Sequence, residues 1–469
     1  MIDFNHLRKY RENNRIEAKR ATGGLPESIW ETYSAFANTM GGVILLGVVE
    51  KKDKSFEAVD LSDPDSLAGE FWSLVNNPAK ASVNILTKHD IAVHRVEEKR
   101  ILSITVPRAE RRDRPVYVNG DPYTGTYRRD GEGDYHCSRE AVKAMMADAL
   151  EESCDSCLLT YADMTALDEK SVREYRKMMH ALRPGHVWES LEDEEFLCRI
   201  EGAGHDREGI CHPTAAGLLM FGKEENILVE FPEFSLRFQG SPDWGHNLFQ
   251  FYKRVWPRIM NLLQLKRERA KEEMTLERAI KDALANCLVN GDYQSEGGIE
   301  IAVGTEEITF ANPGSFRMDI EKARKGGESD PRNAGLNRMF QLIQVSEGLG
   351  SGLARIYSVW NRHGLSAPVI EERFCPERII LHLSLKKHSL LPLNNRKNAS
   401  IRSVFDAKQL QKQTVIDYVT RNVAVTEKQL SMLPELESCS LPELLKEMCR
   451  EDILTSQVRG NKTMYSLKA

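Results

Sequence analysis

A helix-then-strand pattern near the N-terminus constrains the fold of this chain more than any other feature of its sequence. Apolar side chains recur at helical spacing over residues 28–39, and Gly41 and Gly42 follow as residues that end helices. An uninterrupted apolar run, residues 43–49, comes directly after the two glycines. A run of this kind is typical of a strand that is buried on both faces. The pattern therefore predicts a helix packed against a buried strand, with Glu50 at the end of the strand.

Acidic side chains and a lysine flank this block. Glu12, Glu17 and Lys19 precede it, and Glu50 closes it. Carboxylate oxygens are the ligands that Mg²⁺ and Mn²⁺ prefer, and an ammonium group can stabilise a phosphate, so the set is suited to phosphodiester hydrolysis. Asp53 lies close enough in the sequence to replace Glu50 as the third carboxylate. A solvated charged face is the alternative explanation of these residues.

This set of residues resembles the Schlafen AlbA-type domain over about residues 1–145. Members show two glutamates and a lysine, an Ala-Phe-x-Asn-x-x-Gly-Gly helix end (residues 35–42 here), a strand and a further acidic residue. In the nuclease members, an acidic trio binds the metal that cleaves structured RNA such as tRNA, and a setting in phage defence is implied. The resemblance implies catalytic roles for Lys19 and for the metal ligands Glu12, Glu17 and Glu50. Other members carry the block without known cleavage, so binding without catalysis is the alternative.

The charge of the chain limits how it can meet a nucleic acid. A net charge of −6 over 469 residues excludes a uniformly basic surface, so contact with phosphates needs a local basic patch. Arginines gather over residues 108–129, where Tyr117, Tyr123 and Tyr127 alternate with them as in sites that stack single-stranded bases. A solvated loop rim is the alternative. The predicted nucleic-acid-binding residues are Arg108, Arg111, Arg112, Arg114, Arg128 and Arg129.

Cysteine usage and hydropathy bear on the setting of the protein and on zinc. Nine cysteines without a repeating framework, and a start with no charged-then-apolar leader, predict a reducing cytoplasm. No apolar run approaches the length of a membrane span, so no membrane partner is expected. Cys154 and Cys157, with His136 and Cys137 upstream, offer the ligand types of a zinc site. One Cys-x-x-Cys pair is weak support, so we expect free or buried thiols and no zinc.

A helix predicted over residues 276–288 carries the next informative pair. It places Asp282 and Asn286 one turn apart on the same face. An acid and an asparagine at this spacing can position a water molecule and ligate the Mg²⁺ of a bound nucleotide. The pair therefore predicts a nucleotide site on this helix.

Two further groups follow in the same order as in a nucleotide-binding module. Asn312 and Gly314 come after a predicted hairpin with strands at residues 299–303 and 307–310. A glycine-rich segment then precedes a predicted helix, and glycines at a helix start leave backbone N–H groups free to bind phosphate. These glycines are Gly348, Gly350 and Gly352.

The order of these motifs resembles the degenerate GHKL ATPase module of RecG-like bacterial proteins. The resemblance implies that the seven residues from Asp282 to Gly352 named above bind ATP. That family usually has Glu where this chain has Asp282, and Asp where it has Asn312. A shorter acid and a missing carboxylate weaken a positioned base and adenine selection, so we expect ATP binding with little or no hydrolysis. A structural remnant that binds nothing is the alternative.

The C-terminal segment predicts a winged helix-turn-helix after a polar linker. Helices are predicted over residues 407–421, 426–432 and 441–451, and a hairpin follows. A helix that reads the major groove of DNA is basic, whereas acidic side chains are prominent on the third predicted helix. A protein contact that forms a homo-oligomer is therefore favoured over DNA binding. The acidic positions are Glu443, Glu447 and Glu451, against Lys446 and Arg450.

The patterns together predict an α+β multidomain protein. Its leading interpretation is a cytoplasmic, metal-dependent endoribonuclease that favours RNA over DNA, with the remaining domains in regulation or assembly. An ATP-binding transcriptional regulator without nuclease activity, and a scaffold with an extinct nucleotide site, are the alternatives. The predicted parts are a Schlafen AlbA-type α/β domain (1–145), a bridging α/β segment (146–268), a GHKL-like α/β sandwich (269–386) and a winged helix-turn-helix (401–469).

Overall fold

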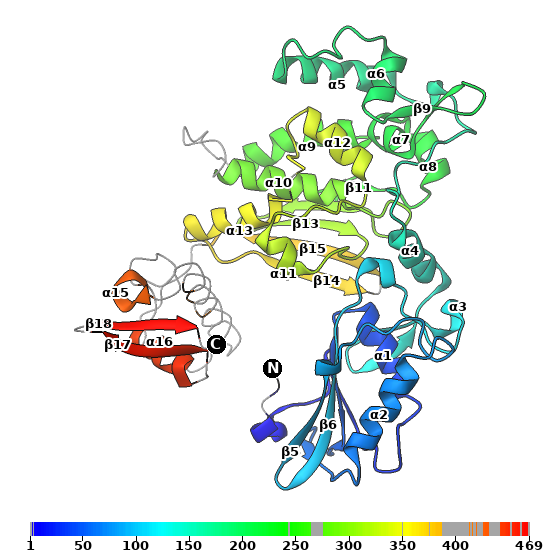
Figure 1. The fold of residues 1–469 in the computed structure, drawn as a ribbon. Coiled ribbons are helices and arrows are strands. Elements are labelled where there is room, and N and C mark those ends of the chain that lie inside the picture. Colours follow the sequence, from blue (N-terminus) through cyan, green and yellow to red (C-terminus); the bar gives the residue numbers. More distant parts are fainter. Residues whose placement is uncertain are drawn as a thin grey trace. The chain divides into compact units, whose positions relative to one another are not determined.

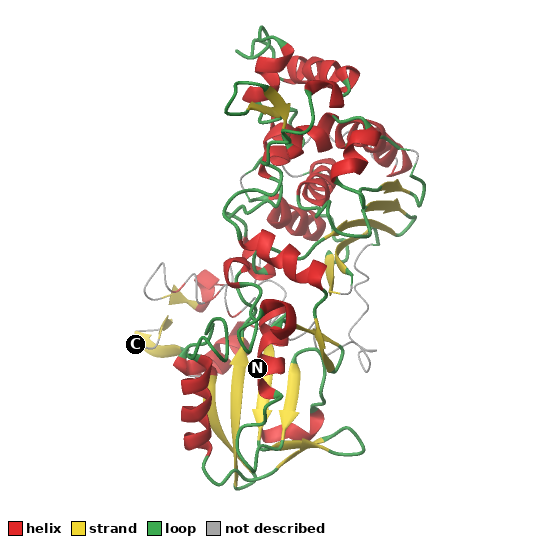
Figure 2. Ribbon diagram, turned by 90° about the vertical axis from the view of Figure 1, so that its right-hand side faces the viewer, coloured by secondary structure: helices red, strands yellow, loops and turns green. Residues whose placement is uncertain are grey.

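The computed structural model describes most of the chain. Its described residues are 2, 4–242, 244–263, 275–348, 350–374 and 376–386, followed by 412, 415, 419, 425–430, 441–450, 453–459 and 462–467. The chain divides into two compact units, Met1–His388 and Ser389–Ala469. Helices occur together with several separate sheets (Figure 2), which confirms the predicted α+β multidomain class.

A four-stranded sheet forms the centre of the N-terminal domain, in the order β1-β2-β6-β5. Its elements are β1 (Ile16–Lys19), β2 (Gly42–Leu46), β5 (Ile91–Val96) and β6 (Lys99–Val106), with helices α1 (Ile29–Asn38) and α2 (Pro64–Val75). β1 lies parallel to β2, so that Glu17 is opposite Ile44, and the other neighbours are antiparallel. Trp30 of α1 and Phe71 of α2 stack at 5.2 Å between ring centroids in the core that these helices share with the sheet.

The apolar run over residues 43–49 forms two strands rather than the single strand that we predicted. β2 ends at Leu46, and β3 (Val48–Glu50) pairs with β4 (Phe56–Ala58) in a separate sheet. Gly47 breaks the run, because its φ is 78° and a side chain there would lie 2.9 Å from the backbone oxygen of Val59. Glu50 still ends the run, but on β3.

Asn38 ends α1 and fastens the following loops to it. Its amide nitrogen donates to the backbone oxygens of Val116 at 2.7 Å and Tyr127 at 3.1 Å, and its oxygen accepts from the Val116 N–H at 2.8 Å. These bonds position the segment that carries the predicted basic residues. The other elements of this region are η1 (Phe4–Lys9), η2 (Lys88–Asp90), η3 (Arg111–Asp113), α3 (Pro122–Gly125), β7 (Tyr127–Asp130), β8 (Gly133–His136) and α4 (Arg139–Ala149).

The bridging segment is mostly helical and begins with a short turn of helix. Thr214 caps α7, since its hydroxyl accepts a hydrogen bond from the Gly217 N–H at 3.0 Å. The elements are η4 (Met164–Ala166), α5 (Glu169–Leu182), α6 (Asp193–Arg199), β9 (Ala203–His205), β10 (Cys211–Pro213), α7 (Ala215–Phe221), α8 (Glu224–Glu230), β11 (Leu236–Phe238) and α9 (Leu248–Leu263).

The GHKL-like region is built on a five-stranded sheet in the order β11-β12-β13-β15-β14. β11 comes from the bridging segment and runs parallel to β12, and the remaining neighbours are antiparallel. β13 extends three residues past its predicted end, because Asn312 pairs with Ile379 of β15. The elements are α10 (Leu276–Val289), β12 (Ile299–Val303), β13 (Glu307–Pro313), α11 (Ile320–Lys325), α12 (Ala334–Leu342), α13 (Gly352–Arg362), β14 (Val369–Phe374) and β15 (Glu377–Ser384).

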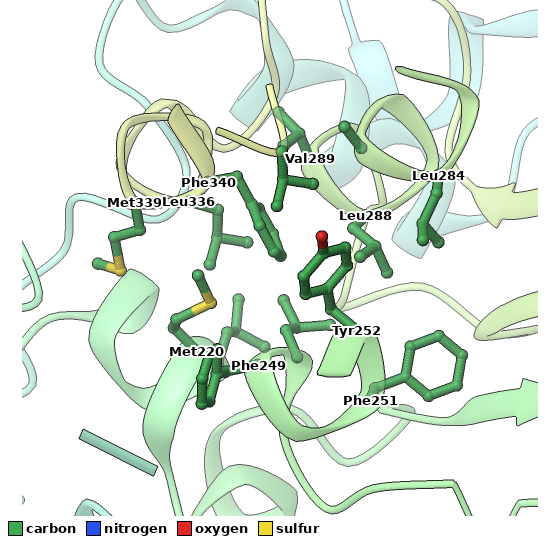
Figure 3. Close-up of a cluster of buried hydrophobic side chains, with 14 of the residues drawn as sticks. Met220, Phe249, Phe251, Tyr252, Leu284, Leu288, Val289, Leu336, Met339 and Phe340 are labelled. Atoms are coloured by element: carbon green, nitrogen blue, oxygen red, sulfur yellow. The ribbon is translucent and has the colours of Figure 1, made fainter. Parts of the chain in front are cut away.

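One hydrophobic core joins the bridging segment to the GHKL-like region. Met220 of α7 and Phe249 of α9 belong to the same buried cluster as Leu288 of α10 and Phe340 of α12, and these side chains are drawn together in Figure 3. Figure 1 places α9, α10 and α12 next to one another beside the sheet. The helices of the two segments therefore support each other, and α10 is held in a fixed position against the sheet.

The C-terminal unit contains a three-stranded antiparallel sheet in the order β16-β18-β17. Leu430, Leu445 and Leu454 are buried in its small core. The first predicted helix, residues 407–421, falls mainly outside the described residues, so the winged helix-turn-helix stays a prediction. The described elements are β16 (Val425–Thr426), α15 (Glu427–Leu430), α16 (Leu441–Arg450), β17 (Leu454–Arg459) and β18 (Lys462–Leu467).

The helices in the described part of the chain are too short or too polar to span a membrane.

Candidate functional site

Glu17 lies on β1 with both carboxylate oxygens bound by cations. Lys19 Nζ is 2.9 Å from Oε1, and Arg129 Nη2 is 2.8 Å from Oε2. Lys19 is two residues further along the strand, so its side chain leaves the same face as that of Glu17. A second ion pair, 2.9 Å long, joins Arg129 to Asp134, and the guanidinium lies over the ring of Phe36. Arg129 is therefore a buried structural cation, with 1% of its side chain exposed.

Glu17 and Glu50 both lie close enough to Glu12 for their charges to act on its carboxyl group. Burial raises the pKa of Glu12, and the charges of Glu17 and Glu50 raise it further. Glu12 accepts a hydrogen bond from the Ala18 N–H at 3.2 Å. Glu50 pairs with Lys54 at 3.2 Å through Oε2, while its buried Oε1 has no hydrogen-bond partner. The fold therefore gathers the three predicted carboxylates in one region.

These carboxylates do not form a ready-made metal site. Within the described ranges, no three acidic side chains bring their oxygens within 4.8 Å of one another. A shared Mg²⁺ would need oxygens at about 2.1 Å, and both oxygens of Glu17 are already occupied. Asp53, the alternative third carboxylate, accepts hydrogen bonds from the N–H and hydroxyl of Ser55 instead. In this arrangement, Glu12, Glu17 and Glu50 cannot all bind the same cation.

The loop after β6 directs its arginines against the GHKL-like region. Arg108 forms a bidentate ion pair with Glu372, with N···O distances of 2.6 and 2.9 Å. Arg128, on β7, forms an ion pair with Glu377, so it also links the N-terminal domain to the GHKL-like region. Both guanidiniums lie beside the ring of Phe374, each 5.9 Å from its centroid. The contact leaves Arg128 buried and 15% of the Arg108 side chain exposed.

Two more arginines extend this contact. Arg111 Nε lies 2.5 Å from Asp330 Oδ2, and Arg114 donates to the backbone oxygen of Phe316 at 3.1 Å. Burial, with the nearby charge of Arg108, lowers the pKa of Arg114 to about 9. We call this set the arginine junction. It consists of Arg108, Arg111, Arg114 and Arg128.

The predicted basic patch is therefore not present as an exposed surface. Four of its six arginines form the arginine junction, and Arg129 belongs to the Glu17 network. Arg112 differs, since 65% of its side chain is exposed and its partner, Glu151, is 3.7 Å away. The physical reason is that carboxylates from a distant part of the sequence neutralise these cations, and no local pattern reveals such partners.

One pocket in the GHKL-like region collects residues that lie far apart in the sequence. Its lining includes the apolar side chains of Phe310, Ile379 and Leu381 together with several polar groups. Gly314 is outside the lining, although a side chain there would come within 2.9 Å of Arg332, which does line the pocket. The predicted residues that it brings together are Asp282, Asn286, Asn312, Gly348, Gly350 and Gly352.

Asp282 is held inside this pocket by two arginines. Arg355 Nε is 2.7 Å from Oδ2, and Arg278 Nη2 is 3.2 Å from Oδ1. Burial raises the pKa of Asp282 to about 6, although both arginines lower it. Arg355 is also paired with Glu347. A carboxylate with both oxygens engaged is not free to activate water, so the arrangement does not favour hydrolysis.

Our sequence reasoning missed these partners of Asp282. Arg278 lies four residues earlier on the same helix, and this i,i+4 spacing could have revealed it. Arg355 comes from α13, and only the packing of α13 on α10 brings it to Asp282.

The glycine-rich segment forms a turn that touches α10. Gly348 and Gly350 have φ values of 71° and 66°, which favour glycine. A side chain at Gly350 would also lie 2.0 Å from the backbone oxygen of Glu328. Gly352 begins α13, and its Cβ position is 3.2 Å from Nδ2 of Asn286. The start of an eleven-residue helix and the predicted Mg²⁺ ligand therefore meet at one end of the pocket.

The pocket and the arginine junction share a wall. Phe316 and Asp330 line the pocket, and the same two residues accept bonds from Arg114 and Arg111. Arg332 also lines the pocket and forms a buried ion pair, 2.6 Å long, with Asp148 of α4. A change in the shape of this wall would therefore alter the contacts that Arg111, Arg114 and Asp148 of the N-terminal side make with it.

The residues considered for zinc in the sequence are not drawn together. Cys154 and Cys157 are free and exposed. The ring of His136 lies against Tyr127, with 4.2 Å between centroids. No metal-type group that includes these residues occurs among the residues that the structure covers.

Comparisons with known proteins identify the domains. Residues 12–138 match the model of the family "Schlafen, AlbA_2", and residues 296–380 match "Putative ATP-dependent DNA helicase recG C-terminal". The chain thus contains an N-terminal Schlafen AlbA_2 domain and a RecG-type ATPase-like domain, as the sequence motifs predicted. These domains indicate a nucleic-acid-related function. Between them, residues 143–237 match DUF8451, a domain of unknown function.

Two solved structures resemble parts or all of the chain. The DIP2311 protein from Corynebacterium diphtheriae is 14% identical, with a TM-score of 0.40, over 97% of this chain and 95% of its own. The N-terminal domain of a putative ATP-dependent DNA helicase RecG-related protein from Nitrosomonas europaea is 32% identical, with a TM-score of 0.23, over 29% of this chain and 90% of its own. No curated protein matched the chain. The assignment of domains therefore rests on the family models.

Proposed function

We propose that this protein binds an adenine nucleotide in the pocket between α10 and α13 and uses it to control nucleic-acid binding by its Schlafen AlbA_2 domain. The observation that carries this proposal is the convergence of six predicted nucleotide-binding residues, from Asp282 to Gly352, on one pocket. A nucleotide module that keeps its fold would bring these distant residues to a common lining, so their convergence supports the proposal.

The chemistry of the pocket supports a nucleotide. Phe310 and Leu381 offer apolar surface for a flat base, and the glycine turn and start of α13 suit phosphates. Asn286 offers an amide oxygen to a Mg²⁺ that accompanies the phosphates. Bound ATP would supply binding free energy rather than energy from hydrolysis, because Asp282 is engaged by Arg278 and Arg355. The residues present thus fit nucleotide binding without rapid turnover.

The shared wall supports a regulatory link. A nucleotide that moved Asp330 or Phe316 would change the contacts of Arg111 and Arg114. If the arginine junction opened, its guanidinium groups would become available to bind nucleic-acid phosphates. If it tightened, they would stay paired and inaccessible to phosphates. RNA as the preferred nucleic acid, a cytoplasmic setting and a homo-oligomer formed through the C-terminal unit complete this proposal. The RNA preference rests on the family resemblance, the cytoplasmic setting on cysteine usage, and the homo-oligomer on the acidic third predicted helix.

Titration calorimetry with ATP, ADP and a non-hydrolysable ATP analogue, each with Mg²⁺, tests the proposal. Wild-type protein should bind, Asn286→Ala should bind at least about tenfold more weakly, and Asn361→Ala, on the exposed end of α13, should match wild type. Fluorescence anisotropy with tRNA, single-stranded RNA and duplex DNA should then change when nucleotide is added. Absence of heat in the wild type would rule out the nucleotide site.

A metal-dependent endoribonuclease, acting on structured RNA in defence against phage, is the second candidate function. It is favoured by the clustering of Glu12, Glu17 and Glu50 and by the buried, unpartnered Oε1 of Glu50. These glutamates could hold a cation only if Lys19 or Arg129 released Glu17. A substrate phosphate would attract Lys19 and so promote this release.

A cleavage assay separates the two candidates. The protein is incubated with tRNA and Mg²⁺ or Mn²⁺, with and without EDTA, and compared with Glu17→Gln and with the exposed control Glu97→Gln. Cleavage that EDTA and Glu17→Gln abolish, and that Glu97→Gln leaves unchanged, supports the nuclease. Binding without cleavage leaves the regulator as the function.

A further inference from the structure

A cluster of two cysteines and a histidine lies in the bridging segment, away from both sites described above. Cys198 is on α6, His205 ends β9 and Cys211 begins β10. Cys198 Sγ lies 3.8 Å from Cys211 Sγ and 3.9 Å from His205 Nδ1, and all three atoms are within 4.8 Å of one another. Among the described residues, no other three His, Cys, Asp or Glu side chains bring their ligand atoms this close together.

The distance between the two sulfurs matches an edge of a tetrahedral zinc site, and the distance from Cys198 Sγ to His205 Nδ1 exceeds such an edge by about 0.4 Å. Zinc bonds of about 2.3 Å to sulfur and about 2.0 Å to nitrogen imply about 3.8 Å between two sulfurs and about 3.5 Å between sulfur and nitrogen. A disulfide would instead place the two sulfurs about 2.05 Å apart, and both cysteines are free. The ligand atoms of Cys198, His205 and Cys211 are therefore close enough for small side-chain adjustments to bring them onto one cation.

The local fold holds the cluster in this arrangement. β9 and β10 form an antiparallel pair in which His205 is directly opposite Cys211. Asp206 fixes the turn between them, since its carboxylate accepts from the N–H groups of Glu208 at 2.9 Å and Ile210 at 2.8 Å. Because the turn sets the register, both ligands project from paired positions of a rigid hairpin toward the end of α6.

A carboxylate supports the histidine on its far side. Glu194 Oε1 lies 3.4 Å from His205 Nε2, while Nδ1 of the same ring faces the sulfurs. Histidine ligands of zinc commonly donate their second N–H to a carboxylate, which fixes the tautomer and the ring orientation. Glu194 is one turn before Cys198 on α6, so the helix supplies both a ligand and its support.

We propose that Cys198, His205 and Cys211 form a zinc-binding site that fastens α6 to the β9–β10 hairpin. Two thiolates and an imidazole are the donor set of zinc proteins. A water molecule would complete the four ligands that zinc prefers. The site lies within the domain of unknown function and is independent of the proposed nucleotide and nucleic-acid sites.

Metal analysis of the untagged full-length protein tests this proposal. Purified without chelators, it should carry about one zinc per chain. Cys198→Ser and Cys211→Ser should each lose the zinc, whereas Cys157→Ser, which removes an exposed free thiol nearby, should retain it. Glu194→Gln should keep zinc but bind it about tenfold more weakly in a competition with a chromogenic chelator.

Thiol labelling of the wild type keeps the test valid if the serine variants fail to fold. After removal of metal, added Zn²⁺ should slow alkylation of Cys198 and Cys211 and leave Cys157 unchanged, as read by peptide mass spectrometry. A metal-free protein whose thiols label equally with and without Zn²⁺ would overturn the site. A Cys198–Cys211 disulfide in freshly purified protein, or copper in place of zinc, would overturn it as well.

Discussion

Arg355 donates from Nε to Oδ2 of Asp282 at 2.7 Å, inside the pocket where an ATPase needs a free carboxylate. The two residues lie on α13 and α10, so their ion pair also ties together the two helices that border the pocket. The same carboxylate binds Arg278. In the proposed nucleotide site, the acid thus serves to hold α10 and α13 together, which favours binding over turnover.

Arg355→Ala should destabilise the protein by roughly 2–3 kcal/mol, because it leaves a buried carboxylate with one cation fewer. Arg373→Ala provides the matched control. Its pair with Glu371 is 2.6 Å long but both side chains are about half exposed, so its loss should cost less than about 1 kcal/mol. Thermal denaturation followed by circular dichroism measures both. Equal effects of the two variants would contradict the structural role of the Asp282 pair.

Gly350→Ala should weaken ATP binding strongly and lower the melting temperature. A methyl group there would lie 2.0 Å from the Glu328 backbone oxygen, in addition to the strain of a φ of 66°. Gly364→Ala isolates the strain, since Gly364 has a φ of 63° and no atom within 4 Å of its Cβ position. Calorimetry should therefore show lost ATP affinity for Gly350→Ala only. Similar ATP affinities of the two variants would show that the turn does not shape the pocket.

Local patterns predicted six of the residues that line the pocket, but not the partners of Asp282. The helix predicted over residues 276–288 is α10, with one residue added, because its apolar spacing repeats within a single element. An apolar run does not reveal that Gly47 has a positive φ. We therefore predicted one strand where the structure has two, β2 and β3. The arginine junction was misjudged for a related reason. Glu372 and Glu377 lie more than two hundred residues from Arg108 and Arg128, and only the fold brings them together.

Arg111→Ala should reduce the effect of nucleotide on nucleic-acid binding, because it removes the ion pair with Asp330 on the wall of the pocket. Arg112→Ala is the matched neighbour, and its exposed side chain should contribute to nucleic-acid affinity without altering the response to nucleotide. Anisotropy titrations of RNA with and without ATP measure both quantities. If Arg112→Ala changed the nucleotide response as much as Arg111→Ala, the shared wall would not carry the link.

The pH dependence of stability should reveal the environment of Glu12. Its pKa is raised above 4.5 by burial and by the charges of Glu17 and Glu50, so the folded state holds this proton more tightly than the unfolded state does. Stabilisation from the bound proton is therefore complete below pH 4.5 and is lost as the pH rises through the raised pKa. Relative to Glu12→Gln, which cannot ionise, wild-type protein should lose stability across this window and change no further above it.

Melting temperatures of wild type and Glu12→Gln, measured from pH 4 to pH 8, give the difference in stability between the two proteins at each pH. Glu97→Gln, at an exposed glutamate of the same domain, serves as the control and should show no such window. A cation held by these glutamates favours their ionised form, so added Mg²⁺ should reduce the loss if the nuclease candidate is correct. A difference that grows in favour of wild type with rising pH would mean that Glu12 is stabilised as a carboxylate, contrary to its crowding by Glu17 and Glu50.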